Sequence, residues 1–86
     1  MTLSYLQKAK NELSILDKPV QKRIKKYLDE VEKLENPRSR GKALSANLAG
    51  LWRYRVGDYR IICRIQDDEL IVCVVDVGHR KDVYVE

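Results

Sequence analysis

Three arginines lie close together in the middle of the chain, on either side of a predicted hairpin turn. Arg53 and Arg55 occupy alternate positions of an aromatic and apolar stretch, and Arg60 follows across the Gly57-Asp58 turn. Alternate side chains of a strand point to the same face, so these arginines should gather on one face of a sheet. Guanidinium groups stay charged and bind phosphate through paired hydrogen bonds. The spacing therefore indicates an anion site, unless nearby carboxylates neutralise it. The carboxylates in question are those of Asp58, Asp76, Asp82 and residues 67–69.

The only histidine of the chain, His79, lies between a glycine and Arg80 where an apolar stretch ends, and Tyr84 follows. Imidazole titrates near neutral pH, and a tyrosine can donate a proton or stack on a base. With the arginines, these are the parts needed to cleave RNA. A ribose 2′-OH is deprotonated and attacks the adjacent phosphate, and the leaving 5′-oxygen is protonated. The alternatives are a solvated histidine and a tyrosine that only packs. No Cys or His spacing fits a metal site, so we expect neither metal nor cofactor.

The 86 residues suffice for one domain, residues 1–86, with a small core. Residues 38–65 hold seven basic residues and one acidic residue, whereas residues 66–86 hold two and six. This excess of positive charge favours an anionic partner such as nucleic acid, and the alternative is a solvated basic face. The chain has no apolar run of membrane-spanning length and no secretory segment, which favours a cytoplasmic protein with no membrane partner.

Hydrophobic periodicity predicts a short strand at residues 2–5 followed by two helices. The second helix should begin at Asp17, with Pro19 in its first turn, and end before Asn36-Pro37. The expected apolar faces are Leu6, Ala9, Leu13 and Leu16 in the first helix and Val20, Ile24, Tyr27, Leu28, Val31 and Leu34 in the second.

A basic connection at residues 38–50, with one helical turn near residues 43–48, should lead to strands at 51–56, 59–66 and 70–77. The last strand is apolar without alternation, so it is expected to be central and buried on both faces. Cys63 and Cys73 fall within apolar runs and are expected to be buried free thiols. The predicted fold class is α+β, with a short N-terminal strand, a helix hairpin and a three- to four-stranded, mainly antiparallel sheet. The helices should pack on one face of that sheet.

Two motifs in this order resemble the RelE group of the RelE/ParE toxin superfamily. They are Trp52-Arg-Tyr-Arg-Val-Gly-Asp-Tyr-Arg60 and, after an acidic turn and an apolar strand, Val77-Gly-His-Arg-Lys-Asp-Val-Tyr84. The likeness extends upstream through the helix hairpin and Asn36-Pro37. It implies a toxin of a type II toxin–antitoxin system with a RelE-like fold and ribonuclease activity, in many members on mRNA in the ribosomal A site. It also implies an antitoxin encoded beside the toxin, and an acidic, partly disordered antitoxin segment would suit the basic surface.

The resemblance assigns roles by position. Arg60 and Arg80 match phosphate-binding arginines of the family, and Tyr84 matches a tyrosine thought to stack on or position the substrate base. Arg53 and Arg55 stand where some members carry lysines, one of them a proposed base. Arginine does not readily give up a proton, so the histidine near the C-terminus is the expected substitute. The expected catalytic residues are Arg60, His79, Arg80 and Tyr84, and the expected phosphate-binding residues are Arg53, Arg55, Lys42 and Lys81.

Two other functions remain open at this point. A ParE-like toxin would inhibit DNA gyrase by binding, without nuclease chemistry, and a third kind of member would retain only its antitoxin contacts. The fold cannot separate these functions. The arginines, the histidine and the tyrosine all stand in motif context, which favours the ribonuclease.

Overall fold

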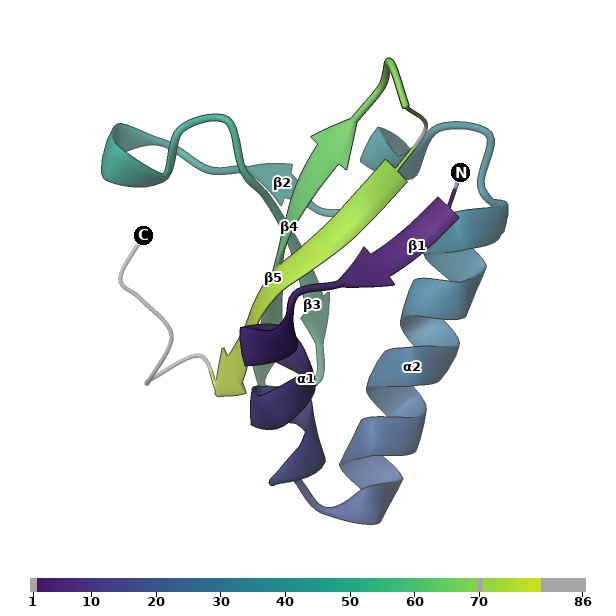
Figure 1. Ribbon diagram of the computed structural model, residues 1–86, viewed down its shortest axis with the longest axis vertical. Coiled ribbons are helices and arrows are strands. Elements are labelled where there is room, and N and C mark those ends of the chain that lie inside the picture. The colour runs from purple at the N-terminus through teal and green to yellow at the C-terminus, as the bar shows by residue number, and fades with distance from the viewer. Residues whose placement is uncertain (1, 70, 80–86) are drawn as a thin grey trace.

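The computed structural model describes residues 2–69 and 71–79. Its strands are β1 (Thr2–Tyr5), β2 (Lys42–Ala43), β3 (Trp52–Val56), β4 (Tyr59–Gln66) and β5 (Ile71–His79). Its helices are α1 (Gln7–Ser14) and α2 (Lys18–Lys33), with short 3₁₀ helices η1 (Pro37–Ser39) and η2 (Ala46–Leu48). The strands form one sheet in the order β1-β5-β4-β3-β2, in which β1 is parallel to β5 and the other pairs are antiparallel (Figure 1). The predicted α+β class is confirmed.

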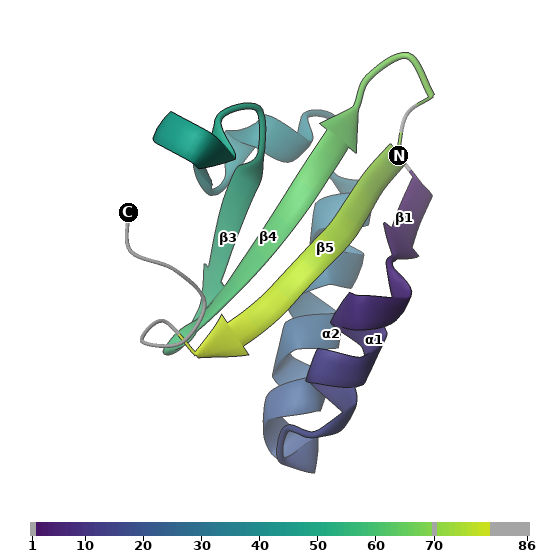
Figure 2. The same cartoon turned by 60° about the vertical axis from the view of Figure 1, so that its left-hand side comes forward.

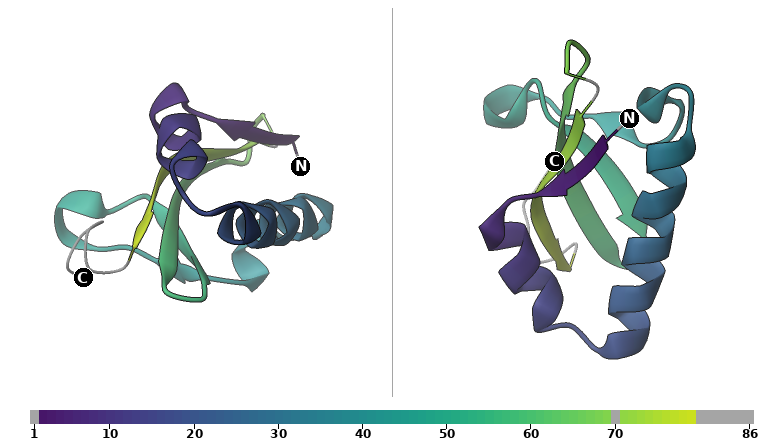
Figure 3. Two further views of the ribbon diagram at one scale, coloured as in Figure 1. Left: turned by 90° about the horizontal axis from the view of Figure 1, so that it is seen from below. Right: turned by 45° about the vertical axis from the view of Figure 1, so that its right-hand side comes forward.

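Helices α1 and α2 form the predicted hairpin on one side of the sheet (Figure 3). Ala9 and Leu13 of α1 and Ile24, Leu28 and Val31 of α2 are buried in one core, as their spacing predicted. Burying these aliphatic side chains is the main force that holds the hairpin on the sheet. No described helix is long and apolar enough to cross a membrane.

The ends of the helices differ from the prediction in two details. Leu6 precedes α1 and is 44% exposed, so it does not belong to the buried face. Asp17 stands at the N-cap position of α2, but its side chain makes no capping hydrogen bond. The two helices are instead joined by Gln21, whose side-chain amide donates to the carbonyl oxygens of Leu16 at 2.7 Å and Ser14 at 3.2 Å.

The aromatic residues of β3 face the helices, as expected. Tyr54 is fully buried, and its ring meets that of Tyr27 edge-on at 5.9 Å between centroids. Its hydroxyl donates to the carbonyl oxygen of Pro37 at 2.6 Å, and the Trp52 indole N–H donates to the carbonyl of Arg40 at 2.7 Å. These bonds fasten the chain that follows α2 to β3, the strand that carries Arg53 and Arg55.

Strand β5 is internal but not central, which corrects the prediction. It lies between β1 and β4, and β4 occupies the middle of the sheet (Figure 2). Val74 and Val77 are buried in the core, whereas Cys73 and Val75 are only half-buried. The helices cover one face of the sheet only, so an unbroken apolar run need not be buried on both faces. Cys63 is buried as expected, Cys73 is not, and both are free thiols.

The connection between α2 and β3 contains more structure than one helical turn. The predicted turn is present as η2. Strand β2, whose two residues pair with Trp52 and Arg53, was not predicted. Gly41 has a φ of +81°, and a Cβ there would collide with the carbonyl oxygen of Arg53. Glycine therefore allows this segment to approach β3 closely enough to pair with it.

Three acidic groups, two buried and one half-buried, predict loss of stability at alkaline pH. Burial and nearby Asp29 raise the pKa of Tyr5 to about 12, and burial likewise raises the pKa of Tyr54 and of Cys63 above their ordinary values of 10.0 and 9.0. Because these pKa values are higher in the folded protein, stability is fully present below the unfolded values and is lost as pH rises. We expect the free energy of unfolding, measured with urea, to fall between about pH 9 and 12. A constant value across that range would contradict this burial.

Candidate functional site

The face of the sheet that the helices leave uncovered is strongly basic. Arg55 and Arg60 are direct partners across β3 and β4, and Arg53 is the partner of Lys42 on β2. Paired residues of antiparallel strands project to the same face, and Tyr54, between the two arginines of β3, is buried on the other. The predicted side-by-side arrangement is therefore confirmed. We call this surface the arginine face; its cations are Lys42, Arg53, Arg55, Arg60 and Arg64.

The guanidinium groups of the arginine face differ in exposure. Arg55 is exposed and Arg60 is half-buried, while Arg53 is only 6% exposed. The Nε atoms of Arg53 and Arg60 are both buried, so the sheet holds the stems of these side chains in place. A guanidinium held in this way is ordered before an anion arrives, which is the condition for efficient stabilisation of developing charge.

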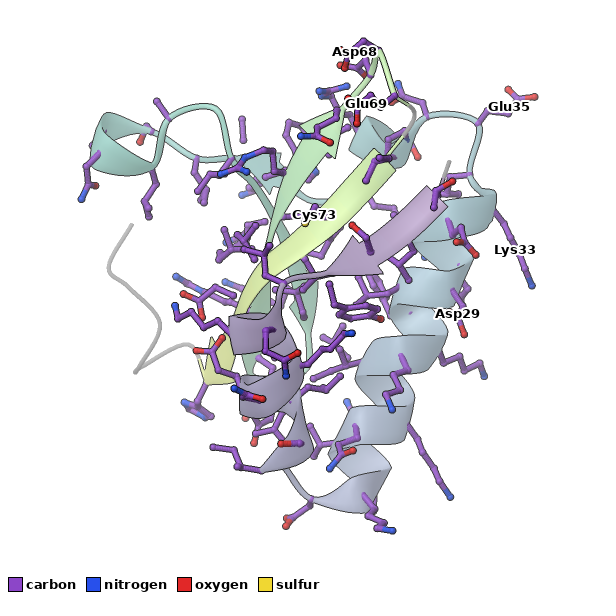
Figure 4. All side chains as sticks on the ribbon, in the orientation of Figure 1. Asp29, Lys33, Glu35, Asp68, Glu69 and Cys73 are labelled. Carbon is purple, nitrogen blue, oxygen red and sulfur yellow. The ribbon has the colours of Figure 1, made fainter. Side chains whose placement is uncertain are left out.

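Two carboxylates that could have neutralised the arginine face pair elsewhere. Asp67 binds Arg38 through two hydrogen bonds of 2.7 and 3.0 Å, and Asp76 binds Lys8 at 3.0 Å. The Arg38 guanidinium also holds the pKa of Asp67 below its usual value. Figure 4 shows Asp68 and Glu69 at the tip of the β4–β5 turn, the end of β4 opposite to Arg60. Of the predicted alternative partners, Asp67 and Asp76 are thus bound to other cations, Asp68 and Glu69 stand beyond the Arg64 end of β4, and Asp58 lies in the turn before Arg60. Asp82 lies outside the described residues.

His79 lies on the other face of the sheet. It is the direct partner of Tyr59, whose side chain packs against the core, and the two rings meet edge-on at 5.6 Å. Both residues line a cavity of about 440 Å³ beside α1. Arg60, by contrast, is paired with Gly78 and projects to the arginine face. His79 and Arg60, both expected to be catalytic, therefore project to opposite faces of the sheet.

The end of β5 is tied to α1 by residues that the sequence did not single out. The Glu12 carboxylate accepts the Val77 N–H at 3.1 Å, on the side of β5 where β1 has already ended. Burial and neighbouring Asp76 raise the pKa of Glu12, while Lys8 bonds to Asp76. These contacts join residues that are 65 or more positions apart in the sequence, so no local sequence pattern predicts them.

The other expected site residues, Arg80, Lys81 and Tyr84, lie outside the described residues. Arg64 was not among the expected site residues, although its position in the sequence indicates it. Arg64 continues the alternate positions of Arg60 and Ile62 along β4, and it is exposed. Within residues 2–69 and 71–79, no three His, Cys, Asp or Glu side chains gather as metal ligands would.

Comparisons with known proteins agree with this geometry. The family model of the ParE toxin of type II toxin–antitoxin systems, parDE, matches residues 3–84. The toxin RelG of Mycobacterium tuberculosis is 43% identical to this chain over 44 residues. The aligned region covers 51% of this chain, and the chain spans about half (51%) of the length of that relative.

Two solved structures show the same fold over nearly the whole chain. One is the toxin–antitoxin complex RelBE2 from Mycobacterium tuberculosis, with 28% identity, a TM-score of 0.82 and coverage of 92% of this chain and 96% of that chain. The other is a mutant of the E. coli toxin RelE in the free state, with 26% identity, a TM-score of 0.77 and coverage of 95% and 85%. The family match, the RelE-like fold and the basic sheet face together place this chain in the RelE/ParE superfamily of type II toxin–antitoxin toxins.

Proposed function

We propose that this toxin is an endoribonuclease that cleaves ribosome-bound mRNA in the cytoplasm. The observation that carries the proposal is the pairing of Arg55 with Arg60 on the face of the sheet that the helices leave uncovered. Like charges at directly paired positions repel each other, and an anion that binds both side chains offsets this repulsion. A phosphodiester supplies that anion, and guanidinium is the group best suited to bind it.

The proposed reaction is an in-line transfer within the RNA strand. The ribose 2′-OH gives its proton to a base and attacks the adjacent phosphorus, a bond from phosphorus to the 2′-oxygen forms, and the bond to the 5′-oxygen breaks as that oxygen takes up a proton. Negative charge grows on the phosphate oxygens, where Arg60 and Arg80 would stabilise it. Tyr84 would stack on or position the neighbouring base. The remaining cations would hold the RNA backbone; they are Arg53, Arg55, Lys42 and Lys81. Because arginines supply the positive charge, the proposed reaction requires no metal.

Proton transfer is the step that the geometry constrains most. The sequence predicts His79 as the base, and that role stays a prediction, but its ring faces α1 and Tyr59 rather than Arg60. If His79 is the base, His79→Gln should lower the single-turnover cleavage rate and remove the ascending limb of its pH profile, whereas a rate within about threefold of wild type and an unchanged profile would show that it is not. A true general base would contribute about 10²–10⁴-fold and an ascending limb near pH 6–7. Loss of both in His79→Gln would show that His79 is the base and that the end of β5 rearranges on RNA.

A second function is favoured by one comparison, because the matching family model is named for ParE. A ParE-like toxin would act on DNA gyrase by binding. The two functions are separated by assaying the purified toxin in parallel for cleavage of mRNA on programmed ribosomes and for inhibition of gyrase supercoiling. The proposal expects new RNA 5′ ends and unchanged supercoiling, and the reverse result would establish the alternative.

We further propose that an antitoxin covers the arginine face in the resting cell. The RelBE2 structure is a toxin–antitoxin complex. An acidic, partly disordered segment of a protein encoded beside this toxin would complement the basic surface and fold on contact. Association measured by stopped flow should slow as salt concentration rises. A rate that is independent of salt would argue against an electrostatic partner on this face.

A further inference from the structure

Arg64 extends the arginine face well beyond the residues assigned to the reaction. It projects from β4 to the same side as Arg60, because both stand at alternate positions with Ile62 between them. The pairing of β4 with β3 is regular from Tyr59 to Cys63, and the register shift against β5 places its extra residue, Val75, on β5, so alternation along β4 is kept. Four residues of strand separate the Cα atoms of Arg60 and Arg64 by about 13 Å. When both side chains extend straight out from the sheet, their guanidinium groups lie too far apart to share one phosphate. They then define two separate positions on this face.

Arg64 differs from two basic residues of the connection that follows α2. Arg38 is neutralised by Asp67 and Arg40 by Glu30, at 2.7 and 3.1 Å. Arg64 is exposed, and it makes no ion pair or side-chain hydrogen bond with the part of the chain that the structure describes. Its cross-strand partner on β5 is the uncharged Cys73. An exposed cation in this setting is open to an anion from outside the chain.

The surroundings of Arg64 suit a strand that runs along the sheet. The connection that holds η2 projects from the side of the sheet away from α2 and borders the arginine face (Figures 2 and 3). This connection joins β2 to β3, and Lys42 and Arg53 pair across these two strands. Arg53 of β3 is the partner of Ile62, so positive charge continues from Arg60 toward Arg64 on that side. On the other side Asp76 of β5 is the partner of Ile62 and bonds to Lys8, and Asp68 and Glu69 follow beyond the end of β4.

We propose that Arg64 binds a second phosphate of the RNA, several nucleotides away from the scissile phosphate at Arg60. This inference rests on the proposed ribonuclease function and defines a distal subsite for it. In a stacked strand each nucleotide rises about 3.4 Å, so 13 Å spans about four nucleotides, and fewer where the strand is extended. The subsite recognises the sugar–phosphate backbone and carries no base preference of its own. The distal subsite therefore makes the affinity of the toxin for RNA depend on the length of the bound segment.

The test measures RNA binding without cleavage. Fluorescein-labelled 2′-O-methyl RNA oligomers of about three and about nine nucleotides, whose methylated 2′-oxygen cannot attack, are titrated with wild type, Arg64→Gln and Lys22→Gln. Lys22 is a matched control, because it is an exposed cation on α2 and its replacement changes the net charge equally. We expect Arg64→Gln to weaken binding of the longer oligomer about fivefold and to reduce the slope of log Kd against log salt by about 0.7, as for one lost phosphate contact.

The shorter oligomer and the control variant decide the outcome. The inference requires that the loss in Arg64→Gln be larger for the longer oligomer than for the shorter one, and that Lys22→Gln show no such difference. Equal losses for both lengths, or equal losses in both variants, would overturn the distal subsite. Cleavage of mRNA on programmed ribosomes by wild type is measured separately. If wild type binds with the predicted length dependence but does not cleave, the proposed function fails and the subsite stands.

Discussion

Replacing Arg60 by alanine is expected to lower the rate of mRNA cleavage by about 10²–10³-fold, as for the loss of one preorganised group that stabilises transition-state charge. Arg60 lies opposite Arg55 on the arginine face, and its buried Nε indicates that the sheet holds its guanidinium in place. The measurement is a single-turnover time course with saturating toxin, which reports the chemical step rather than binding.

Two variants control for folding and for charge. Arg60→Lys keeps the positive charge but loses the paired hydrogen bonds, so its rate should lie between those of wild type and Arg60→Ala. Lys22→Ala removes a cation from α2 and should cleave at the wild-type rate. The free energy of unfolding of Arg60→Ala should change by about 1 kcal/mol or less. A folded Arg60→Ala protein with the wild-type rate would exclude Arg60 from the reaction.

Replacing Tyr54 by alanine is expected to destabilise the protein by about 3–5 kcal/mol, the usual cost of truncating a buried aromatic residue. Tyr54 is fully buried and contacts Tyr27, and its hydroxyl satisfies the carbonyl oxygen of Pro37. Domains of this size have about 5–15 kcal/mol of stability, so the variant approaches unfolding at 37 °C. Chemical denaturation followed by circular dichroism measures the change.

Tyr54→Phe separates packing from the hydrogen bond in this prediction. It keeps the ring and leaves the Pro37 carbonyl without its partner, which should cost about 1–3 kcal/mol. If both variants were destabilised equally, the ring would contribute little, and the packing of β3 described above would be contradicted. The arginine face depends on this packing, because Tyr54 stands between Arg53 and Arg55 on one strand.

The elements of the fold could largely be predicted because their signals are local. The periodic apolar residues of the two helices, the Gly57-Asp58 turn and the alternation of β3 each depend on a few neighbouring residues. Gly57 adopts a φ of +59° in a two-residue hairpin that pairs Val56 with Tyr59, as its place in the sequence suggested. The side to which Arg53 and Arg55 project follows directly from this alternation.

The orientation of His79 could not be predicted, because it depends on a β-bulge. The register between β4 and β5 shifts at Ile62 and Cys63, and Val74 and Val77 consequently both face the core although they are three residues apart. Simple alternation from Val74 would have placed His79 on the arginine face. A shift of one residue moves every later side chain to the other face, and nothing in the local sequence marks this one.

The contacts that hold the end of β5 against α1 could not be predicted from the sequence either. Glu12 and Val77 are neighbours because α1 packs where β1 stops, a result of the tertiary arrangement rather than of either segment alone. Arg64 is a different case. Its spacing from Arg60 was visible in the sequence, and only the shared face showed that the two residues belong to one surface.

The central claim is that the arginine face carries out cleavage of RNA on the ribosome. The most direct measurement adds purified wild type or Arg60→Ala to ribosomes programmed with a defined mRNA and maps new RNA 5′ ends by primer extension. The account predicts a discrete cut with wild type that is reduced about 10²-fold or more with folded Arg60→Ala. No cut with wild type, or the same cut with both proteins, would contradict it.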